Sequence, residues 1–347
     1  MRSLKSCRLL PVAALCLLTA HAAVAAPGYR IELVGKGHGV APKWASSISD
    51  NGSIVGGAVD DQTEAGIQFR SHRGKKVEGL VESQGVHYPG NPQINNAGVV
   101  VGRYMRDWEE RGGMWASDGT LTDLAPVVGC DDSRGVYPQA INDKGSLAIQ
   151  VDCQINGVRT QGGFLVRDGV AMLLPTFNGK PTYPKAMNKR DQVAGGTEGA
   201  NGELRAFIWQ DGKSMQYVGR AGEDTYSFAI SDRGHVVGMV SANLHWHPFL
   251  YDGKAMRELP KCNEREVWPV GVNGDDWIVG NFYDLGVPRE AALVRNGECT
   301  ELKSMLDGSG AGWTVLEADD INNDGVIVGH GLFEGYRRVF IATPLSR

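Results

Sequence analysis

Hydrophobic and polar positions follow one pattern that recurs seven times along the chain. Each copy has an aliphatic anchor residue, a short polar cluster rich in Asn, Asp and Gly, and then a Val-rich run, as in INNDGVIVGHG at 321–331. Such clusters connect two short strands, so every copy predicts a β-hairpin beside its anchor. The anchors are Ile48, Ile94, Ile141, Met187, Ile230, Val272 and Ile321.

The distance between anchors predicts the architecture. The intervals are 46, 47, 46, 43, 42 and 49 residues, and repeats in the low-to-mid forties are typical of four-stranded propeller blades. Each copy divides into strand a before the anchor, the Val-rich strand b, a strand c such as RAFIWQ, and a strand d after a tight turn. We therefore predict an all-β fold, a seven-bladed β-propeller of four-stranded antiparallel blades in a single domain over 26–347.

Three positions in the copies carry turn chemistry. Asn or Ser follows every anchor and can bond the backbone to start a turn. Gly or Asp stands four residues after the anchor, which indicates a left-handed backbone. A Gly eight residues after the anchor, replaced by Ile149 in one copy, indicates a close backbone approach or a bulge. A calcium-binding loop is the alternative interpretation, but the copies lack its regular carboxylates.

The two ends of the predicted domain complement each other. The last copy stops after strand c, whereas GYRIELVGKGHG at 28–39 is similar to strand d of the fourth copy, GKSMQYVGRAGE. Pairing 29–34 with the final three strands would close the ring and remove its open edges. An open solenoid would have no need of complementary ends.

The recurring motif A-x-x-I-N-x-x-G-x-V-V-G, followed by an AF-x-W-like strand and a D-G turn, resembles the HAF-type bacterial extracellular repeat proteins. The ending GWTVLEADDINNDGVIVGHG carries the same resemblance, which covers essentially all of 26–347. Ile149 and the strand EAALVR depart from the pattern. The resemblance implies an exported repeat protein, and it implies no reaction and no catalytic residue.

Residues 1–25 have the features of a secretory signal peptide. Three basic residues precede an apolar run, and Ala23-Val24-Ala25 has the small-x-small pattern of a cleavage site. We expect cleavage near Ala25, a secreted or periplasmic location, and no membrane span. Without this segment the chain has 32 basic and 40 acidic residues, a net charge of −8, which argues against nucleic acid as a partner. We expect a monomer.

Four of the six cysteines lie beyond residue 25. An even number in an exported protein favours two disulfides over a metal site, and no C-x-x-C spacing is present. Cys130 and the end of strand b at Cys153 should lie on the same face, so we predict that these two are bonded. Cys262 and Cys299 then pair by elimination.

Aromatic residues precede strand a on the face of the ring that carries the longer b–c and d–a loops, which we call the loop face. Most stand four residues before an anchor, a spacing that puts them on the anchor's side of a regular strand. They could ring the mouth of a central channel and stack on a ligand, or they could pack between blades as core. They are Trp44, Tyr137, Tyr183, Tyr226 and Trp268, with Tyr88 and Trp313 at longer spacings.

The b–c loops on this face differ from copy to copy, and varied loops on a rigid scaffold often carry binding residues. His245 and His247 could form a metal or acid/base pair, although loop histidines are more often solvated or packed. The candidates in these loops are Trp108, His245, Trp246, His247, Tyr283 and Tyr336.

No G-x-S-x-G elbow, H-E-x-x-H motif or phosphate-binding glycine loop is present. We therefore predict no cofactor, no metal ion and no catalytic residue. The expected function is that of a noncatalytic exported binding or scaffold protein that holds a glycan, a peptide or a protein partner. The alternative is a propeller enzyme of the glycan lyase or hydrolase type with a site at the channel mouth. A module that serves mainly in envelope assembly is a third possibility.

Overall fold

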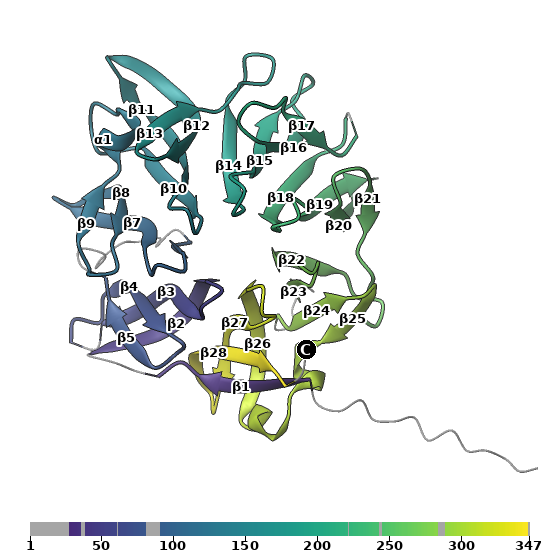
Figure 1. The fold of residues 1–347 in the computed structure, drawn as a ribbon. Helices are drawn as coiled ribbons and strands as arrows, with labels where there is room; N and C mark the ends of the chain where they lie inside the picture. The colour runs from purple at the N-terminus through teal and green to yellow at the C-terminus, as the bar shows by residue number, and fades with distance from the viewer. Residues whose placement is uncertain are drawn as a thin grey trace, which may run out of the picture.

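The chain forms a ring of seven four-stranded antiparallel sheets, as the repeat predicts (Figure 1). The computed structural model describes residues 28–35, 39–60, 62–80, 91–220, 222–242, 245–283 and 289–345. The predicted signal segment and Tyr88 lie outside these ranges. In each sheet the strand that ends at the anchor is innermost and lines the central channel. The next strands follow outward in chain order, except that the outermost strand of the last sheet comes from the N-terminal end.

Six blades are continuous in sequence. Blade 1 comprises β2 (Val40–Ile48), β3 (Ser53–Asp60), β4 (Gly66–His72) and β5 (Lys76–Gly79). Blade 2 comprises β6 (Gln93–Ile94), β7 (Val100–Arg106), β8 (Glu109–Trp115) and β9 (Leu121–Asp123). Blade 3 comprises β10 (Val136–Ile141), β11 (Leu147–Ile155), β12 (Val158–Arg167) and β13 (Val170–Leu173).

Blade 4 comprises β14 (Thr182–Met187), β15 (Val193–Glu198), β16 (Leu204–Trp209) and β17 (Gln216–Val218). Blade 5 comprises β18 (Thr225–Ile230), β19 (Val236–Ala242), β20 (His245–Tyr251) and β21 (Met256–Glu258). Blade 6 comprises β22 (Val267–Val272), β23 (Ile278–Phe282), β24 (Ala291–Arg295) and β25 (Glu298–Glu301). One short helix, α1 (Ala125–Val128), and two 3-10 turns, η1 (Leu302–Met305) and η2 (Gly308–Gly310), lie in connections.

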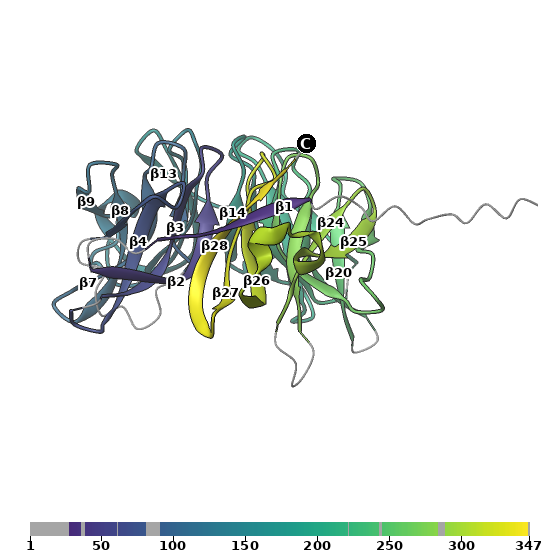
Figure 2. The ribbon, with the colours of Figure 1, turned by 90° about the horizontal axis from the view of Figure 1, so that it is seen from below.

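Blade 7 joins the two ends of the chain and closes the ring. It contains β26 (Trp313–Ile321), β27 (Ile327–Phe333), β28 (Tyr336–Pro344) and, as its outer strand, β1 (Tyr29–Leu33). β1 lies along β28, as Figure 2 shows from the side. Tyr29 is opposite Pro344 and Leu33 is opposite Phe340. The predicted closure by 29–34 is confirmed.

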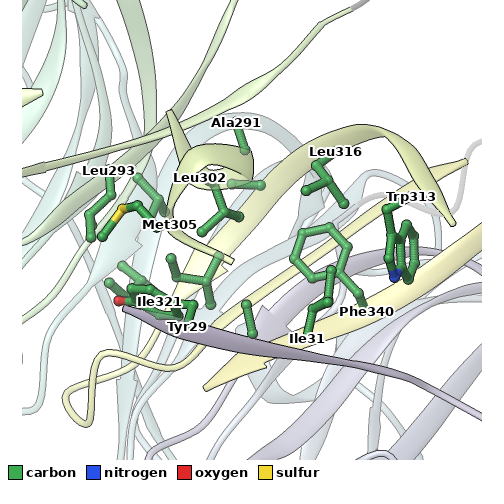
Figure 3. Packing of buried hydrophobic residues seen from close by; sticks show 14 residues of the cluster. Tyr29, Ile31, Ala291, Leu293, Leu302, Met305, Trp313, Leu316, Ile321 and Phe340 are labelled. Atoms are coloured by element: carbon green, nitrogen blue, oxygen red, sulfur yellow. The ribbon is translucent and has the colours of Figure 1, made fainter. Parts of the chain in front are cut away.

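A hydrophobic cluster secures this closure (Figure 3). Tyr29 and Ile31 of β1 are buried with Trp313, Leu316 and Phe340 of blade 7. The Tyr29 hydroxyl donates a hydrogen bond to the Gly325 carbonyl at 3.0 Å, and burial raises the pKa of Tyr29 to about 12. Because buried hydroxyls need a partner, this bond also fixes the position of β1 on the sheet.

Hydrogen bonds in the turn explain why Asn follows most of the anchors. The Asn95 Oδ1 accepts hydrogen bonds from the backbone N–H groups of Ala97 at 3.1 Å and Val99 at 3.0 Å. The Asn95 Nδ2 donates to the Asn142 carbonyl of the next blade at 3.0 Å. One side chain therefore starts the turn, as predicted, and also links two blades. The same link joins Asn142 to Asn188, Asn188 to Ser231, Asn273 to Asn322, and Asn322 to Ser49.

Serine replaces this Asn in blades 1 and 5, and other contacts make the link there. A Ser hydroxyl can accept from the turn, as Ser49 does from Ser53 N–H at 3.1 Å, but it is too short to reach the next blade. Asn51 instead donates its backbone N–H to the Asn96 Oδ1 of blade 2 at 2.8 Å. His235 of blade 5 bonds Asp276 of blade 6 at 2.8 Å.

Substitution of Asn95 separates the two roles of this residue. Asn95→Ser should keep the turn and lose only the bond between blades, which lowers the free energy of unfolding by about 1 kcal/mol. Asn95→Ala also removes the acceptor of the Ala97 and Val99 N–H groups and should cost about 2–3 kcal/mol. Urea denaturation measures both values, and equal losses for the two variants would contradict the dual role.

The turn positions have the predicted backbone. Four residues after the anchor, Gly52 has φ 83° and Asp191 has φ 60°, both in the left-handed region. Eight residues after the anchor, a Cβ atom on Gly195 or Gly238 would collide with the carbonyl oxygen of Tyr183 or Tyr226 on strand a. The close backbone approach that the sequence predicts is therefore confirmed.

Both predicted disulfides are present. Cys130 is bonded to Cys153 in blade 3, with a Cα–Cα distance of 5.8 Å. Cys262 is bonded to Cys299 in blade 6, with a Cα–Cα distance of 5.1 Å. Within the described part of the chain, no helix is long and apolar enough to span a bilayer.

Candidate functional site

The central channel holds a cavity of about 990 Å3 that is lined by all seven blades. A β-bulge interrupts the innermost strand of every blade except blade 2, whose β6 has only two residues. The unpaired residue stands two before the anchor and lines the channel. These lining residues are Ser46, Gln139, Lys185, Phe228, Val270 and Asp319.

The predicted orientation of the aromatic residues before strand a is wrong because of this bulge. In blade 3, Tyr137 lies opposite Gln150 whereas the anchor Ile141 lies opposite Leu147, so the two side chains lie on different sides of the sheet. A regular strand would have put them on the same side, but the extra residue breaks the period of two. Blade 6 has the same bulge and register, and Trp268 lines the channel, whereas Trp44, Tyr137, Tyr183 and Tyr226 do not.

The four aromatic residues outside the channel have other surroundings. The Trp44 ring lies over Gly57, where a Cβ atom would collide with it. Tyr137 packs between blades, with the Arg103 guanidinium of blade 2 over its ring at 5.0 Å. Tyr183 is partly buried, and Tyr226 is 40% exposed and packs on Trp246 of its own blade.

The predicted loop residues lie on the same face but do not form one group. Trp108 is 97% exposed at the tip of the β7–β8 hairpin, and Tyr336 is 65% exposed beside Arg338. His245 and His247 share one side of β20, and His247 lies 3.4 Å from Glu266. Across the residues that the structure covers, no group of three or more His, Cys, Asp or Glu is arranged to hold a metal ion.

Aromatic and charged side chains meet at the loop-face end of the channel in blades 6 and 7. The rings of Trp268 and Tyr283 are 5.1 Å apart with an interplanar angle of 42°. The Arg289 guanidinium lies 4.2 Å from the centre of the Tyr283 ring and 3.7 Å from the Glu317 carboxylate. We refer to Trp268, Tyr283, Arg289 and Glu317 as the mouth cluster.

Two further ionisable groups extend the mouth cluster into the channel. The His330 imidazole lies between two carboxylates, with Nδ1 2.8 Å from Asp319 and Nε2 3.7 Å from Glu317. Burial raises the pKa of Asp319, and the Glu317 charge adds to this, while His330 opposes it. This arrangement can hold and orient a proton, which is the property required of a general acid or base.

The neighbouring carboxyl of Asp320 is tied to blade 1. It accepts hydrogen bonds from the backbone N–H groups of Ile48 at 3.0 Å and Ile321 at 2.8 Å. Burial, with a smaller contribution from the Asp319 charge, raises the pKa of Asp320 to about 6. The folded protein therefore binds this proton more tightly than the unfolded chain does.

A raised carboxyl pKa makes stability depend on pH. The free energy of unfolding should fall as the pH rises from about 4 to about 6, by at most about 3 kcal/mol for Asp320. In Asp320→Asn this part of the pH dependence should be absent, whereas it should persist in Asp168→Asn, which changes an exposed turn residue. Thermal unfolding at pH 4 and pH 7 measures the difference, and an unchanged pH dependence in Asp320→Asn would contradict the assignment.

Glu317, Asp319, His330 and Arg289 were not among the residues predicted from the sequence. The signal for Glu317 was present, because it stands four residues before its anchor, where five other copies have an aromatic residue. Arg289 lies close to Glu317 only through the contact of blades 6 and 7, which no local pattern reveals. His330 lies directly opposite Glu317 in the β26–β27 pair of blade 7.

Comparison with known proteins identifies the fold and no family. No protein-family model and no curated sequence matches the chain. The β-propeller domain of the Trilobed protease from Pyrococcus furiosus, described as having an open velcro topology, is similar with a TM-score of 0.54 and 12% identity over 76% of this chain and 81% of that one. In contrast to that description, the present ring is closed by β1.

Propellers within larger enzymes are also similar. A structure from an analysis of two prolyl endopeptidases matches with a TM-score of 0.56 and 8% identity over 92% of this chain. An acylaminoacyl peptidase from Pyrococcus horikoshii matches with a TM-score of 0.51 and 13% identity over 83% of this chain. The present chain covers 51% and 49% of those two proteins. These matches support the fold alone.

Proposed function

We propose that this protein is an exported binding protein that holds a short glycan segment at the loop-face end of its channel. The observation that carries the proposal is the asymmetry of the mouth cluster. Packing residues recur with the blades, but the contact of Trp268 and Tyr283 with Arg289 and Glu317 is confined to blades 6 and 7. Export is supported by the two disulfides and by the predicted signal segment.

The chemistry of the mouth cluster suits a sugar. Trp and Tyr offer flat apolar faces with polar edges, which can stack on the C–H face of a sugar ring. Tyr283 is 41% exposed, so its ring is open to a ligand. Arg289 and Glu317 supply hydrogen-bond donors and acceptors for hydroxyl groups beside it. A peptide or protein partner would use the same rings, and the test below distinguishes these partners.

Two tyrosines provide a matched test of the site. Tyr283 and Tyr336 are both exposed on the loop face beneath an arginine, at 4.2 Å from Arg289 and 5.3 Å from Arg338. Only Tyr283 lines the channel. Tyr283→Ala should weaken binding of an oligosaccharide about tenfold or more, and Tyr336→Ala should leave it unchanged.

The measurement is binding of the purified protein and both variants to an array of neutral and acidic oligosaccharides, with a random peptide library as comparison. Binding of peptides alone would reject a glycan as the ligand. Equal losses of oligosaccharide binding in Tyr283→Ala and Tyr336→Ala would reject the mouth cluster as the binding site. Both variants should unfold at the wild-type temperature, because neither ring is part of the buried core.

The contact of His330 with Asp319 favours one alternative, a glycan-cleaving enzyme. An imidazole held between two carboxylates could donate or accept a proton at a glycosidic bond. This alternative predicts that bound oligosaccharides are shortened over time and that His330→Gln stops cleavage while binding persists. Mass spectrometry of the oligosaccharides after incubation tests it.

A further inference from the structure

Lys185 occupies an unusual place in the channel. It is the bulge residue of blade 4, so its side chain lines the cavity rather than the outer surface. The equivalent residues of the other bulged blades are uncharged except Asp319 of blade 7. Blades 4 and 7 lie on opposite sides of the ring, with β14 and β26 facing each other across the channel (Figure 1).

The ammonium group of Lys185 has no partner within the described structure. No hydrogen bond or ion pair reaches it, and its side chain is exposed to the channel. Desolvation by the surrounding channel wall lowers the pKa of Lys185, and no carboxylate opposes this shift. Lysines in the turns after the anchors Ile141 and Met187 are paired, Lys144 with Asp191 at 3.0 Å and Lys189 with Asp232 at 2.8 Å. A cation in a cavity without a counter-ion is positioned to receive an anion from outside the protein.

The acidic groups across the channel do not neutralise Lys185. Asp319 is bonded to His330, and Asp320 accepts two backbone N–H groups. Glu317 lies between His330 and Arg289. Each carboxylate therefore has local partners of its own, and the charge of Lys185 remains available.

We propose that Lys185 binds the carboxylate of an acidic sugar whose chain enters the channel past the mouth cluster. This inference rests on the proposed function and specifies its ligand as a uronate-containing oligosaccharide. One ammonium matches one carboxylate, the paired rings of Trp268 and Tyr283 match a sugar face, and the amide of Gln139 in the same lining can bond hydroxyl groups.

The first test uses a galacturonate trisaccharide and its uncharged methyl ester as probes. Lys185→Met keeps the length of the side chain and removes its charge, Lys185→Arg restores the charge, and Lys213→Met is the control on an exposed turn of the same blade. Calorimetry should show the acidic probe bound about 10-fold to 100-fold more weakly by Lys185→Met. Lys185→Arg should recover most of this affinity, and the methyl ester should bind wild type and all variants equally.

A second test needs no substitution. Reductive methylation with formaldehyde at neutral pH, followed by mass spectrometry, reports the accessibility of each lysine. The acidic trisaccharide should protect Lys185 and leave Lys213 reactive, and the methyl ester should protect neither.

Wild-type affinity of Lys185→Met for the acidic probe, or no binding of that probe to the wild type, would overturn the inference. The proposed function would fail by a different result, which is equal binding of neutral oligosaccharides by wild type and Tyr283→Ala. The two failures are therefore distinguishable.

Discussion

Replacement of Ile31 with Asp is expected to lower the free energy of unfolding by about 5 kcal/mol or more. Ile31 is 4% exposed in the cluster of Trp313, Leu316 and Phe340, on the strand that closes blade 7. The change removes a buried aliphatic side chain, which costs about 2–5 kcal/mol, and it places a carboxylate in an apolar cluster without a partner, which adds several kcal/mol. Detachment of β1 would also expose the edge of β28 and promote aggregation.

A neighbouring substitution on the same strand provides the control. Glu32 is exposed, so Glu32→Ala should change stability by no more than about 0.5 kcal/mol. Urea denaturation of the two variants and the wild type gives the comparison. A loss below 1 kcal/mol for Ile31→Asp would mean that the N-terminal strand contributes little to the closed ring.

Removal of both disulfides should have an effect of similar size. The bonds join residues separated by 23 and 37 positions, and loop-closure entropy predicts about 3–4 kcal/mol for each. Since most domains are stable by about 5–15 kcal/mol, loss of both bonds should unfold a large share of the protein at 37 °C. The effects should add, because one bond lies in blade 3 and the other in blade 6.

The measurement uses three variants. The first combines Cys130→Ala and Cys153→Ala, the second combines Cys262→Ala and Cys299→Ala, and the third has all four substitutions. Each pair of substitutions should lower the melting temperature, and dithiothreitol should destabilise the wild type but not the fourfold variant. Equal melting temperatures for the wild type and the fourfold variant would contradict the expected contribution.

The sequence predicted the fold because its signals are local and repeated. The Asn or Ser after each anchor and the left-handed residue four positions after the anchor specify one hairpin, and seven hairpins at similar spacing specify a ring. The closure by β1 was also predictable, because 28–39 is similar to an existing strand d. The blade-to-blade role of Asn95 was not, because it depends on a carbonyl 47 residues away.

The candidate site was only partly predictable. Trp268 and Tyr283 were expected to face a ligand, and both line the channel. The other predicted aromatic residues before strand a have the same spacing and the same bulge as Trp268, but Trp44, Tyr137, Tyr183 and Tyr226 do not line the channel. A bulge depends on how two strands pair, so residue spacing alone does not reveal which side chains enter the channel.

A ligand at the loop-face end of the channel, in contact with blades 6 and 7, should be visible in crystals of the protein grown with the galacturonate trisaccharide. We expect density for the sugar against Trp268 and Tyr283, with its carboxylate near Lys185. Density confined to the outer rim around Trp108 or Trp246, or a channel without sugar, would contradict this binding site.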